Sequence, residues 1–302
     1  MKKKILITGT SGFICQNLQS FLSNDFEVET ISVRYRKDQI LSIDKSVDII
    51  IHTAGMAHDL KNSKSLNDYL DSNFELTKQL YSAFLKSNAS KFLFFSSVKA
   101  VADSIKGKLD SSKVPSPKTH YGISKRKAEE FIISQNTENK VFYILRPCMI
   151  HGDGNKGNLN LLFKIIDAGI PWILGAFRNS RSFLSMDNLN FIVRELAIGD
   201  IRPGLYLLSD SNPISTNSIV RRIGASVSKR IIILKIPKII VKFFAIIGDI
   251  CNLPINSERL NKLTESYVVD NSEILQAMDK KLPLTTEEGL DKTFKTLVKQ
   301  QI

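Results

Sequence analysis

Residues 4–15 read KILITGTSGFIC and join a short apolar run to a turn that contains two glycines. Apolar residues at helical spacing follow over 17–23. Gly9 and Gly12 therefore lie between a strand and a helix, where glycine lets the backbone turn sharply and approach a pyrophosphate held by helix N–H groups. The spacing Gly-x-x-Gly-x-x-Cys places Cys15 at the third glycine position, which requires a small residue for packing. This stretch predicts a dinucleotide-binding turn.

Strand and helix patterns alternate after this turn. The expected strands are 3–8, 27–33, 47–52, 91–96 and 141–145, and the expected helices are 17–23, 67–88 and 121–136. Such alternation predicts right-handed βαβ units on a parallel sheet. The continuous apolar run at 49–51 fits a strand that is covered on both faces. The predicted fold class is α/β, with a doubly wound parallel sheet.

The second half of the chain has a less regular pattern after Gly152. We therefore predict a dinucleotide-binding domain over 1–150 and a smaller region over 151–302. This second region would bind most of the substrate, and some of its segments would return to the first body. The sequence contains no internal repeat and no linker, so the two parts should share one compact body.

The composition is that of a globular protein: 43% of the 302 residues are hydrophobic and 24% are charged. Three cysteines cannot form a disulfide framework, so we expect a cytoplasmic protein. The net charge of +12 is spread evenly over both halves. Nucleic-acid-binding proteins concentrate their charge on one face, so we expect no nucleic-acid partner. A diffuse basic surface fits small molecules that carry phosphate.

We expect no membrane-spanning segment. The apolar run after the N-terminal lysines ends after three residues, too soon for a secretory signal. The most apolar later stretch, 231–250, is interrupted by charges, and Pro237 within it is typical of a helix start. Apolar residues then recur at helical spacing, at 239, 240, 243, 244 and 247. We predict a helix that packs on the body of the protein, with contact to a membrane surface through its lysines as the alternative.

The end of the second strand carries arginines where an NAD-binding site would carry an acidic residue for the ribose 2′-hydroxyl. The sequence there reads SVRYR, which includes Arg34 and Arg36. Guanidinium groups suit a 2′-phosphate, because they grip it through two parallel hydrogen bonds. The pattern favours NADP over NAD as the cofactor, the alternative being that both arginines are simply solvated.

Tyr121 and Lys125 lie four residues apart on a predicted helix and therefore share a face. A lysine ammonium favours tyrosinate, so we expect Lys125 to lower the pKa of Tyr121 towards neutral pH. Ser96 and Ser97 follow the fourth strand, at the sheet edge where such folds bind ligands. A serine hydroxyl there can hold a sugar oxygen beside the tyrosine.

Taken together with IIIHTAG (49–55), SSVKAVAD (96–103), LRPCMIHGDGNKGN (145–158) and YLLSDSNPIST (206–216), these motifs extend nearly from end to end of the chain. The chain resembles the extended short-chain dehydrogenase/reductases, specifically their nucleotide-sugar branch. The resemblance implies a Rossmann domain with a smaller C-terminal substrate-binding region. It implies cofactor contacts from Gly9, Thr10, Gly12, Phe13, Ile14, Ala54, Gly55 and Lys125. Tyr121 would be the acid/base and Ser97, rather than Ser96, its partner.

The resemblance also implies substrate contacts in the second half. Asn158, in the segment 156–158, would lie in a loop that binds the nucleotide diphosphate. Arg181, within RSFLSMDNL, would hold the same diphosphate, which requires a fixed cation. Arg259 would have a similar role, with less support because its surroundings have no distinctive spacing. An ordinary surface arginine is the alternative for both.

The chain departs from the family pattern at positions that limit which reactions are expected of it. Dehydratase relatives carry Asp-Glu after the active-site hydroxyl residue, whereas this chain has Val98 and Lys99, which argues against a 4,6-dehydratase. Residues 100–102 are Ala-Val-Ala instead of the usual Val-Tyr-Gly, so the register of Ser97 is open. The arginines after the second strand favour an oxidoreductase. The stretch 154–182 resembles a subgroup whose 4-reductases act on UDP-4-keto-6-deoxy-N-acetylhexosamines in surface-polysaccharide synthesis, which implies reduction of such a sugar at C4 as the favoured function. The alternatives are an isomerase (a UDP-hexose or UDP-N-acetylhexosamine 4-epimerase) and a non-catalytic, cofactor-sensing binding protein.

The histidines show no metal-ligand spacing among themselves or with the cysteines; they are His52, His58, His120 and His151. Hydride transfer with a nicotinamide needs no metal, so we predict none. The resemblance further implies a possible homodimer, paired through helices of the cofactor domain.

Overall fold

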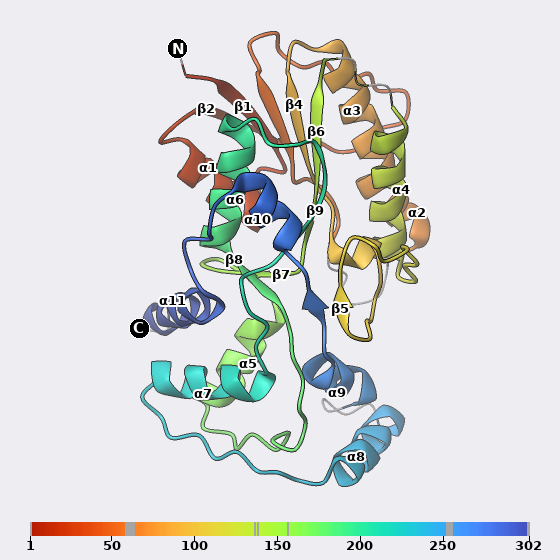
Figure 1. Ribbon diagram of the computed structural model, residues 1–302. Helices are drawn as coiled ribbons and strands as arrows, with labels where there is room; N and C mark the ends of the chain where they lie inside the picture. Colours follow the sequence, from red (N-terminus) through yellow and green to blue (C-terminus); the bar gives the residue numbers. More distant parts are fainter. Residues whose placement is uncertain are drawn as a thin grey trace.

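The computed structural model describes residues 2–57, 64–135, 137, 139–155, 157–251 and 256–300 (Figure 1). Within these residues, six parallel strands form the main sheet, in the order β2-β1-β3-β4-β6-β9. Their bounds are β1 (Lys4–Thr8), β2 (Glu27–Ile31), β3 (Ile49–His52), β4 (Lys91–Phe95), β6 (Val141–Pro147) and β9 (Gly204–Leu208). The predicted doubly wound parallel sheet is confirmed. The chain order reverses at β1, which has β2 on one side and β3 on the other.

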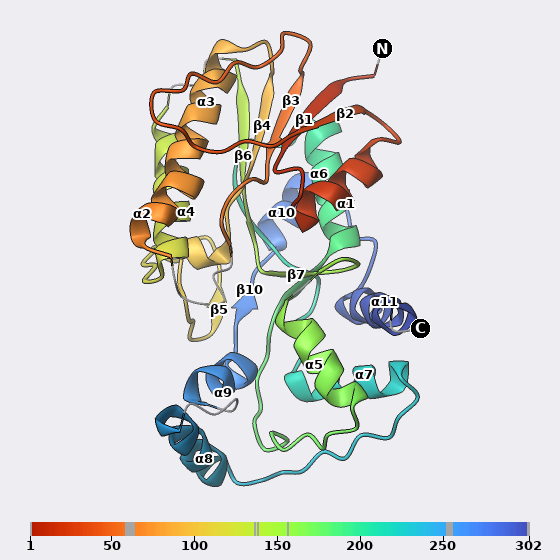
Figure 2. The same ribbon diagram turned by 180° about the vertical axis from the view of Figure 1, so that it is seen from behind.

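Helices cover both faces of this sheet (Figure 1, Figure 2). One face carries α1 (Phe13–Leu22), α6 (Met186–Ile198) and α10 (Ser272–Met278). The other carries α2 (Leu66–Tyr69), the π-helix η1 (Leu70–Glu75), α3 (Leu76–Lys86) and α4 (His120–Ser134).

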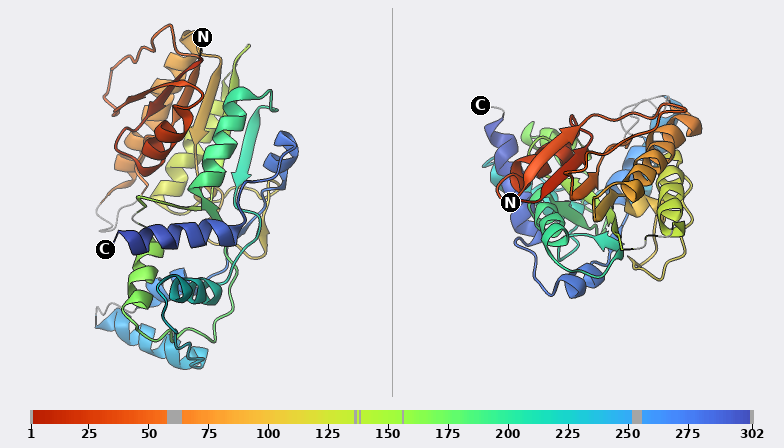
Figure 3. Two further views of the ribbon diagram at one scale, coloured as in Figure 1. Left: turned by 90° about the vertical axis from the view of Figure 1, so that its left-hand side faces the viewer. Right: turned by 90° about the horizontal axis from the view of Figure 1, so that it is seen from above.

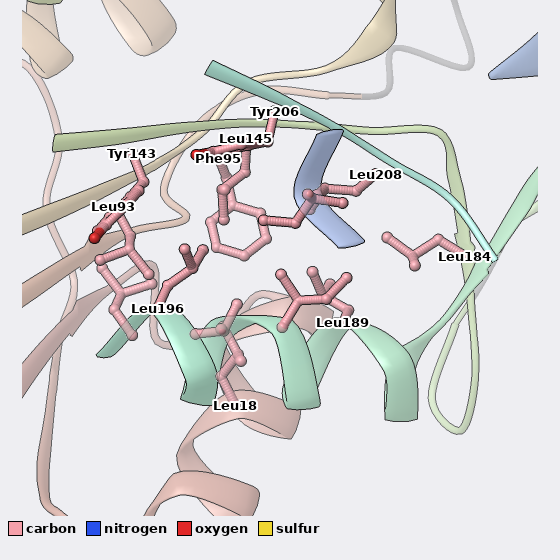
Figure 4. Packing of buried hydrophobic residues seen from close by; sticks show 14 of the residues in the cluster. Leu18, Leu93, Phe95, Tyr143, Leu145, Leu184, Leu189, Leu196, Tyr206 and Leu208 are labelled. Atoms are coloured by element: carbon pink, nitrogen blue, oxygen red, sulfur yellow. The ribbon is translucent and has the colours of Figure 1, made fainter. Parts of the chain in front are cut away.

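Strand β4 has apolar side chains on both sides, because successive residues of a strand point to opposite faces. Leu93 and Phe95 pack with α1 and α6 (Figure 4). Phe92 and Phe94 pack with α3 and α4. This double burial explains why the strands of the sheet appear in the sequence as continuous apolar runs.

The second lobe lies beyond the carboxyl ends of the strands (Figure 1, Figure 3). Its elements are β7 (Met149–His151) paired with β8 (Phe183–Ser185), α5 (Asn158–Asp167), α7 (Thr216–Ser226), α8 (Lys238–Ile250), α9 (Ser257–Thr264) and α11 (Thr286–Lys299). Between the lobes, β5 (Lys108–Leu109) pairs with β10 (Val268–Val269), and a short 3₁₀-helix, η2 (Val98–Ala100), follows β4. A domain boundary at residue 150 stays a prediction. Strand β9 comes from the second half of the chain and completes the sheet.

Helix α8 begins directly after Pro237, as its sequence predicts. It contacts α9 and the core of the second lobe, but not through its large side chains. Its buried residues are the smaller Val241, Ala245 and Gly248. The expectation of an ordinary packed helix is therefore wrong for its bulky apolar residues, which stay exposed. No helix in the described part of the chain is long and apolar enough to cross a membrane.

Candidate active site

The turn between β1 and α1 is shaped by two glycines. Gly9 has φ 95°, and a Cβ there would lie 3.0 Å from the Ala54 Cα. Gly12 caps the N-terminus of α1 and donates its N–H to the Gly9 carbonyl at 2.8 Å. No side chain caps this helix, and its first turn has no acidic residue. The turn thus offers backbone N–H groups and a positive helix end to a phosphate, and it fits the pyrophosphate of a dinucleotide.

The residues around the glycines differ in exposure. Thr10 is exposed, whereas Phe13 and Ile14 are half-buried in the first turn of α1. Cys15 is fully buried in the core cluster beneath the sheet, where burial raises the pKa of its thiol. A small side chain therefore fills the third glycine position without blocking the turn.

The carboxyl end of β3 lies next to the glycine turn. The Ala54 N–H donates to the Thr8 hydroxyl at 3.3 Å. Gly55 has φ 156°, and a Cβ there would lie 2.5 Å from the Asn73 Oδ1 and 3.4 Å from the Lys125 Nζ. Residues 54–55 therefore lie between the glycine turn and Lys125, at the point where the strand order reverses. Ligands of doubly wound sheets bind at such a point.

Tyr121, Lys125 and Ser97 come together at this edge of the sheet. Tyr121 lies in the first turn of α4, and its hydroxyl lies close enough to the side chain of Ser97, which precedes η2, for Ser97 to affect the pKa of the phenol. The Lys125 Nζ donates to the Phe95 carbonyl at 2.7 Å and lies 4.8 Å from the centre of the Phe94 ring. The structure therefore places the Lys125 ammonium group beside Gly55, and it places the Tyr121 phenol near the Ser97 hydroxyl at the same edge of the sheet.

Burial has the largest effect on the pKa values of Tyr121 and Lys125. It raises the pKa of Tyr121 to about 12, against the opposing effect of the hydrogen bond from Ser97. It lowers the pKa of Lys125 to about 8. The expected lowering of the Tyr121 pKa by Lys125 is wrong in this structure, because burial of the phenol outweighs the effects that lower its pKa. At neutral pH the phenol is protonated and can donate a proton.

The two adjacent serines have separate surroundings. The Ser96 hydroxyl donates to the Glu129 Oε1 at 2.5 Å. Glu129 also accepts two hydrogen bonds from the Arg146 guanidinium, at 2.8 and 2.6 Å, and all three residues are buried. Ser96 therefore belongs to a buried polar network behind the site. Ser97 is the serine that reaches the tyrosine.

The two candidate arginines follow β2, whose last residue bonds to the glycine turn. The Gly9 N–H donates to the carbonyl of Ile31, the last residue of β2. Arg34 and Arg36 follow within five residues, and both are exposed. Neither forms an ion pair with a carboxylate among the described residues. Their guanidinium groups are thus available to a phosphate near the turn.

Arg181 is held between several segments of the second lobe. Its backbone pairs with Ile214, and its guanidinium donates to the Lys262 carbonyl and lies 3.9 Å from the Glu265 carboxylate. Burial lowers the pKa of Lys99, and the nearby charge of Arg181 contributes to this shift. Arg181 therefore faces the segment that follows Ser97.

Among the described residues, no contact that brings the remaining candidate substrate residues to Tyr121 is seen. Asn158 begins α5 and is exposed, and its neighbour Lys156 lies outside the described residues. Arg259 is exposed in the first turn of α9, one helical turn before Lys262. Their roles stay predictions.

No described residues form a group of three or more His, Cys, Asp or Glu side chains that could hold a metal ion. His52 lies between the hydroxyls of Thr8 and Thr77, at 2.7 and 3.0 Å, and burial lowers its pKa to about 3. His58 lies outside the described residues.

Residues 5–189 match the NAD dependent epimerase/dehydratase family. The chain belongs to this family. As a member, it is an enzyme of the nucleotide-sugar epimerase and reductase group of extended short-chain dehydrogenase/reductases, and it uses a nicotinamide cofactor. The resemblance noted from the sequence is confirmed.

Three named enzymes are similar in sequence to this chain. UDP-glucose 4-epimerase from Vibrio cholerae is 28% identical over 97% of this chain and 95% of its own. N-acetyl-alpha-D-glucosaminyl-diphospho-ditrans,octacis-undecaprenol 4-epimerase from Escherichia coli O157:H7 is 25% identical, with the same coverage. UDP-2-acetamido-2,6-beta-L-arabino-hexul-4-ose reductase from Pseudomonas aeruginosa is 29% identical over 52% of this chain and 38% of its own.

Solved structures of the family share the whole fold. The Bordetella bronchiseptica enzyme WbmG, in complex with NAD and UDP, has a TM-score of 0.75 at 16% identity, covering 99% of this chain and 96% of its own. RMD from Pseudomonas aeruginosa, complexed with NADPH, has a TM-score of 0.72 at 18% identity, covering 98% and 99%. At these identities the likeness establishes the fold.

Asn73 is a buried residue of the site that the sequence analysis did not find. It lies in η1, where its side chain accepts from the Met56 N–H at 2.7 Å and donates to the Met56 carbonyl at 2.9 Å. It also donates to the Ser124 hydroxyl at 2.9 Å. Asn73 thus fixes the backbone beside Gly55 against α4. Local π-helical turns often occur at functional sites, but a single asparagine in a helical pattern carries no visible signal.

Asp103 positions the start of α4 and was also missed. Its carboxylate accepts from the N–H groups of Lys118 and Thr119 at 2.7 and 3.1 Å. A Cβ on Gly122 would lie 2.4 Å from the Lys99 carbonyl oxygen, so glycine lets the helix approach the segment after Ser97. These contacts place Tyr121 beside Ser97.

The neighbouring serines provide a matched pair of variants. Ser97→Ala should lower kcat about 100-fold, because the phenol and the sugar oxygen lose a hydrogen-bonding partner. Ser96→Ala should leave kcat nearly unchanged but lower the free energy of unfolding by about 1–2 kcal/mol, because Glu129 loses a buried donor. Steady-state kinetics and urea unfolding of both variants measure these effects. A larger loss of kcat in Ser96→Ala than in Ser97→Ala would show that Ser96, and not Ser97, belongs to the site.

The buried ammonium group of Lys125 lowers the free energy of unfolding, and this effect should depend on pH. Its pKa is about 8 in the folded protein against an ordinary value of 10.5, so the unfolded chain binds more protons between these values and stability rises with pH there. Lys125→Met should abolish activity yet raise the free energy of unfolding at pH 7, by up to about 3 kcal/mol. This gain should shrink as the pH approaches 10. Urea unfolding at both pH values tests it, and a variant less stable at pH 7 would contradict it.

Proposed function

We propose that this enzyme reduces the C4 carbonyl of a UDP-4-keto-6-deoxy-N-acetylhexosamine, with NADPH as the cofactor, in surface-polysaccharide synthesis. The main support is the hydroxyl of Tyr121, which is protonated at neutral pH and lies near Ser97, on the helix that also carries Lys125. A carbonyl reduction requires a proton donor at the oxygen that becomes a hydroxyl. One relative is itself a reductase of a hexul-4-ose.

The residues of the site have separate tasks in this proposal. Tyr121 donates a proton to the C4 oxygen, and Ser97 holds that oxygen in line with the phenol. Lys125, held by the Phe95 carbonyl, orients the cofactor ribose at Gly55. The nicotinamide, when bound, supplies the hydride. Arg181 holds the diphosphate of the nucleotide sugar.

The choice of NADPH follows from Arg34 and Arg36, which are exposed just after β2. No acidic residue occupies 32–36 to accept a hydrogen bond from a ribose 2′-hydroxyl. Pairing of two copies of the chain stays a prediction.

A 4-epimerase is the second candidate. The two relatives aligned over 97% of this chain are 4-epimerases, one of UDP-glucose and one of a polyprenyl-diphosphate-linked N-acetylglucosamine. An epimerase needs the same three residues, with Tyr121 first accepting and then returning the proton. It recycles its cofactor and consumes none.

An assay with two substrates separates the candidates. Purified protein is mixed with NADPH and a UDP-4-keto-6-deoxy-N-acetylhexosamine, and separately with UDP-N-acetylglucosamine without added cofactor. The proposal predicts loss of the absorbance of reduced nicotinamide in the first mixture only. Isomerisation in the second mixture, without consumption in the first, would establish the epimerase. Tyr121→Phe serves as the blank for both.

A further inference from the structure

The surface of α8 and of the segment before it is unusually apolar. Fourteen large hydrophobic side chains of the described residues are exposed, and eight of them lie between residues 232 and 250. They are Ile232, Leu234, Ile239, Ile240, Phe243, Phe244, Ile246 and Ile250, and together we refer to them as the α8 patch. Clustered exposure of this kind marks an interaction site, whereas single exposed apolar residues do not.

The helix presents its small side chains to the protein and its large ones to the outside. Val241, Ala245 and Gly248 are buried. The opposite side carries Phe243, 60% exposed, and Ile239, 78% exposed, and Phe244 at the flank is also 60% exposed. A helix that only packs on a core would have the reverse arrangement. The outer face is therefore available to a partner outside this chain's own core.

The charge around the α8 patch is mostly basic. Between 229 and 248 the sequence has five basic residues and no acidic one. Arg230, Lys235, Lys238 and Lys242 are exposed and form no ion pair within the described chain. Lys238 and Lys242 lie one turn apart, beside the apolar stripe. Asp249, the first acidic residue after them, accepts a hydrogen bond from the Ser257 N–H at 3.0 Å.

We propose that the α8 patch docks the enzyme reversibly on an anionic lipid bilayer. An amphipathic helix with bulky apolar residues on one side and lysines beside them is suited to lie in the plane of a bilayer surface. Phe243, Phe244 and Ile239 enter the boundary of the acyl chains, and the lysines bind lipid phosphates.

The charge also disfavours a second copy of this chain as the occupant. A two-fold interface places the same patch on both sides, so Lys235, Lys238 and Lys242 would face their own copies. Within 232–250 the single carboxylate, Asp249, is too few to balance the three lysines of each copy.

The position of the helix allows this docking without blocking the glycine turn. Figure 3 places α8 at the end of the second lobe, remote from the sheet. The connection from α7 to α8, which carries Ile232 and Leu234, runs along the same end (Figure 1). Docking would hold the substrate-binding lobe at the membrane and leave the cofactor side in water.

Vesicle flotation tests this proposal. The unaltered protein should bind vesicles of phosphatidylglycerol and phosphatidylcholine, bind pure phosphatidylcholine about tenfold less, and dissociate at high salt. Phe243→Ser/Phe244→Ser and Lys235→Glu/Lys238→Glu/Lys242→Glu should each reduce binding at least about tenfold. The matched controls, Ile40→Ser/Ile133→Ser and Lys45→Glu/Lys106→Glu/Lys113→Glu, alter exposed residues elsewhere and should bind as the unaltered protein does.

Turnover of a soluble UDP-sugar should be the same in all these variants, so this proposal and the proposed reaction can fail separately. Any of three results would overturn the docking. The unaltered protein could fail to bind anionic vesicles, it could bind both kinds of vesicle equally, or the patch variants could bind as well as the unaltered protein. Light scattering measures the oligomeric state and tests one further outcome. A dimer that the Phe243→Ser/Phe244→Ser variant dissociates, without vesicle binding, would assign the patch to a second copy.

Discussion

A Tyr121→Phe variant should lose about three orders of magnitude in kcat and bind the UDP-sugar almost as tightly as the unaltered protein. Phenylalanine keeps the ring in the first turn of α4 but cannot donate a proton to the C4 oxygen. The loss should therefore appear in kcat, while the dissociation constant for UDP, measured by calorimetry, should change little.

Tyr206→Phe is the matched control. Tyr206 lies on β9, and its hydroxyl donates to the Arg202 carbonyl at 2.6 Å, so the variant also loses one tyrosine hydrogen bond. Its kcat should stay within about twofold of the unaltered value, because the bond contributes only about 1 kcal/mol to stability. Nearly full activity in Tyr121→Phe would remove the proton donor from the proposed reaction.

The second large effect concerns the cofactor. Arg34→Asp should lower the ratio of kcat/KM with NADPH to kcat/KM with NADH by about 100-fold, since a charge-assisted contact is lost and a like charge faces the phosphate. The introduced carboxylate can accept hydrogen bonds from the ribose of NADH. Initial rates at varied concentrations of both cofactors measure the ratio.

Lys45→Asp provides the comparison, because it makes the same change of charge at another exposed position between β2 and β3. That variant should alter the ratio only slightly. An unchanged preference in Arg34→Asp would show that Arg34 is a solvated surface residue and would withdraw the argument for NADPH.

The fold could be predicted because its signal is local. Each strand of the sheet is a short apolar run, and each is followed by a turn and a helical pattern, so the order of elements leads to a parallel sheet. The strand predicted at 91–96 appears as Lys91–Phe95, and the helix predicted at 121–136 as His120–Ser134. The glycine turn was visible because Gly9 and Gly12 stand at a fixed place between β1 and α1.

Contacts between distant residues could not be predicted in the same way. Asn73 reaches Met56 and Ser124, and no pattern of spacing connects these positions. The direction of the Tyr121 pKa shift depends on how deeply the phenol is buried, and the sequence does not show that burial. Helical spacing in 231–250 predicted a helix correctly, but spacing cannot show which side of the helix meets the protein.

Isotope transfer tests the central claim, that the site of Tyr121, Ser97 and Lys125 reduces a sugar at C4. The protein is given NADPH with deuterium at both hydrogens of the nicotinamide C4, together with the UDP-4-keto-6-deoxy-N-acetylhexosamine, and the product is analysed by NMR. The account predicts a product that carries one deuterium at the sugar C4 in a single configuration. A product without deuterium at C4, or with deuterium at another carbon, would contradict it.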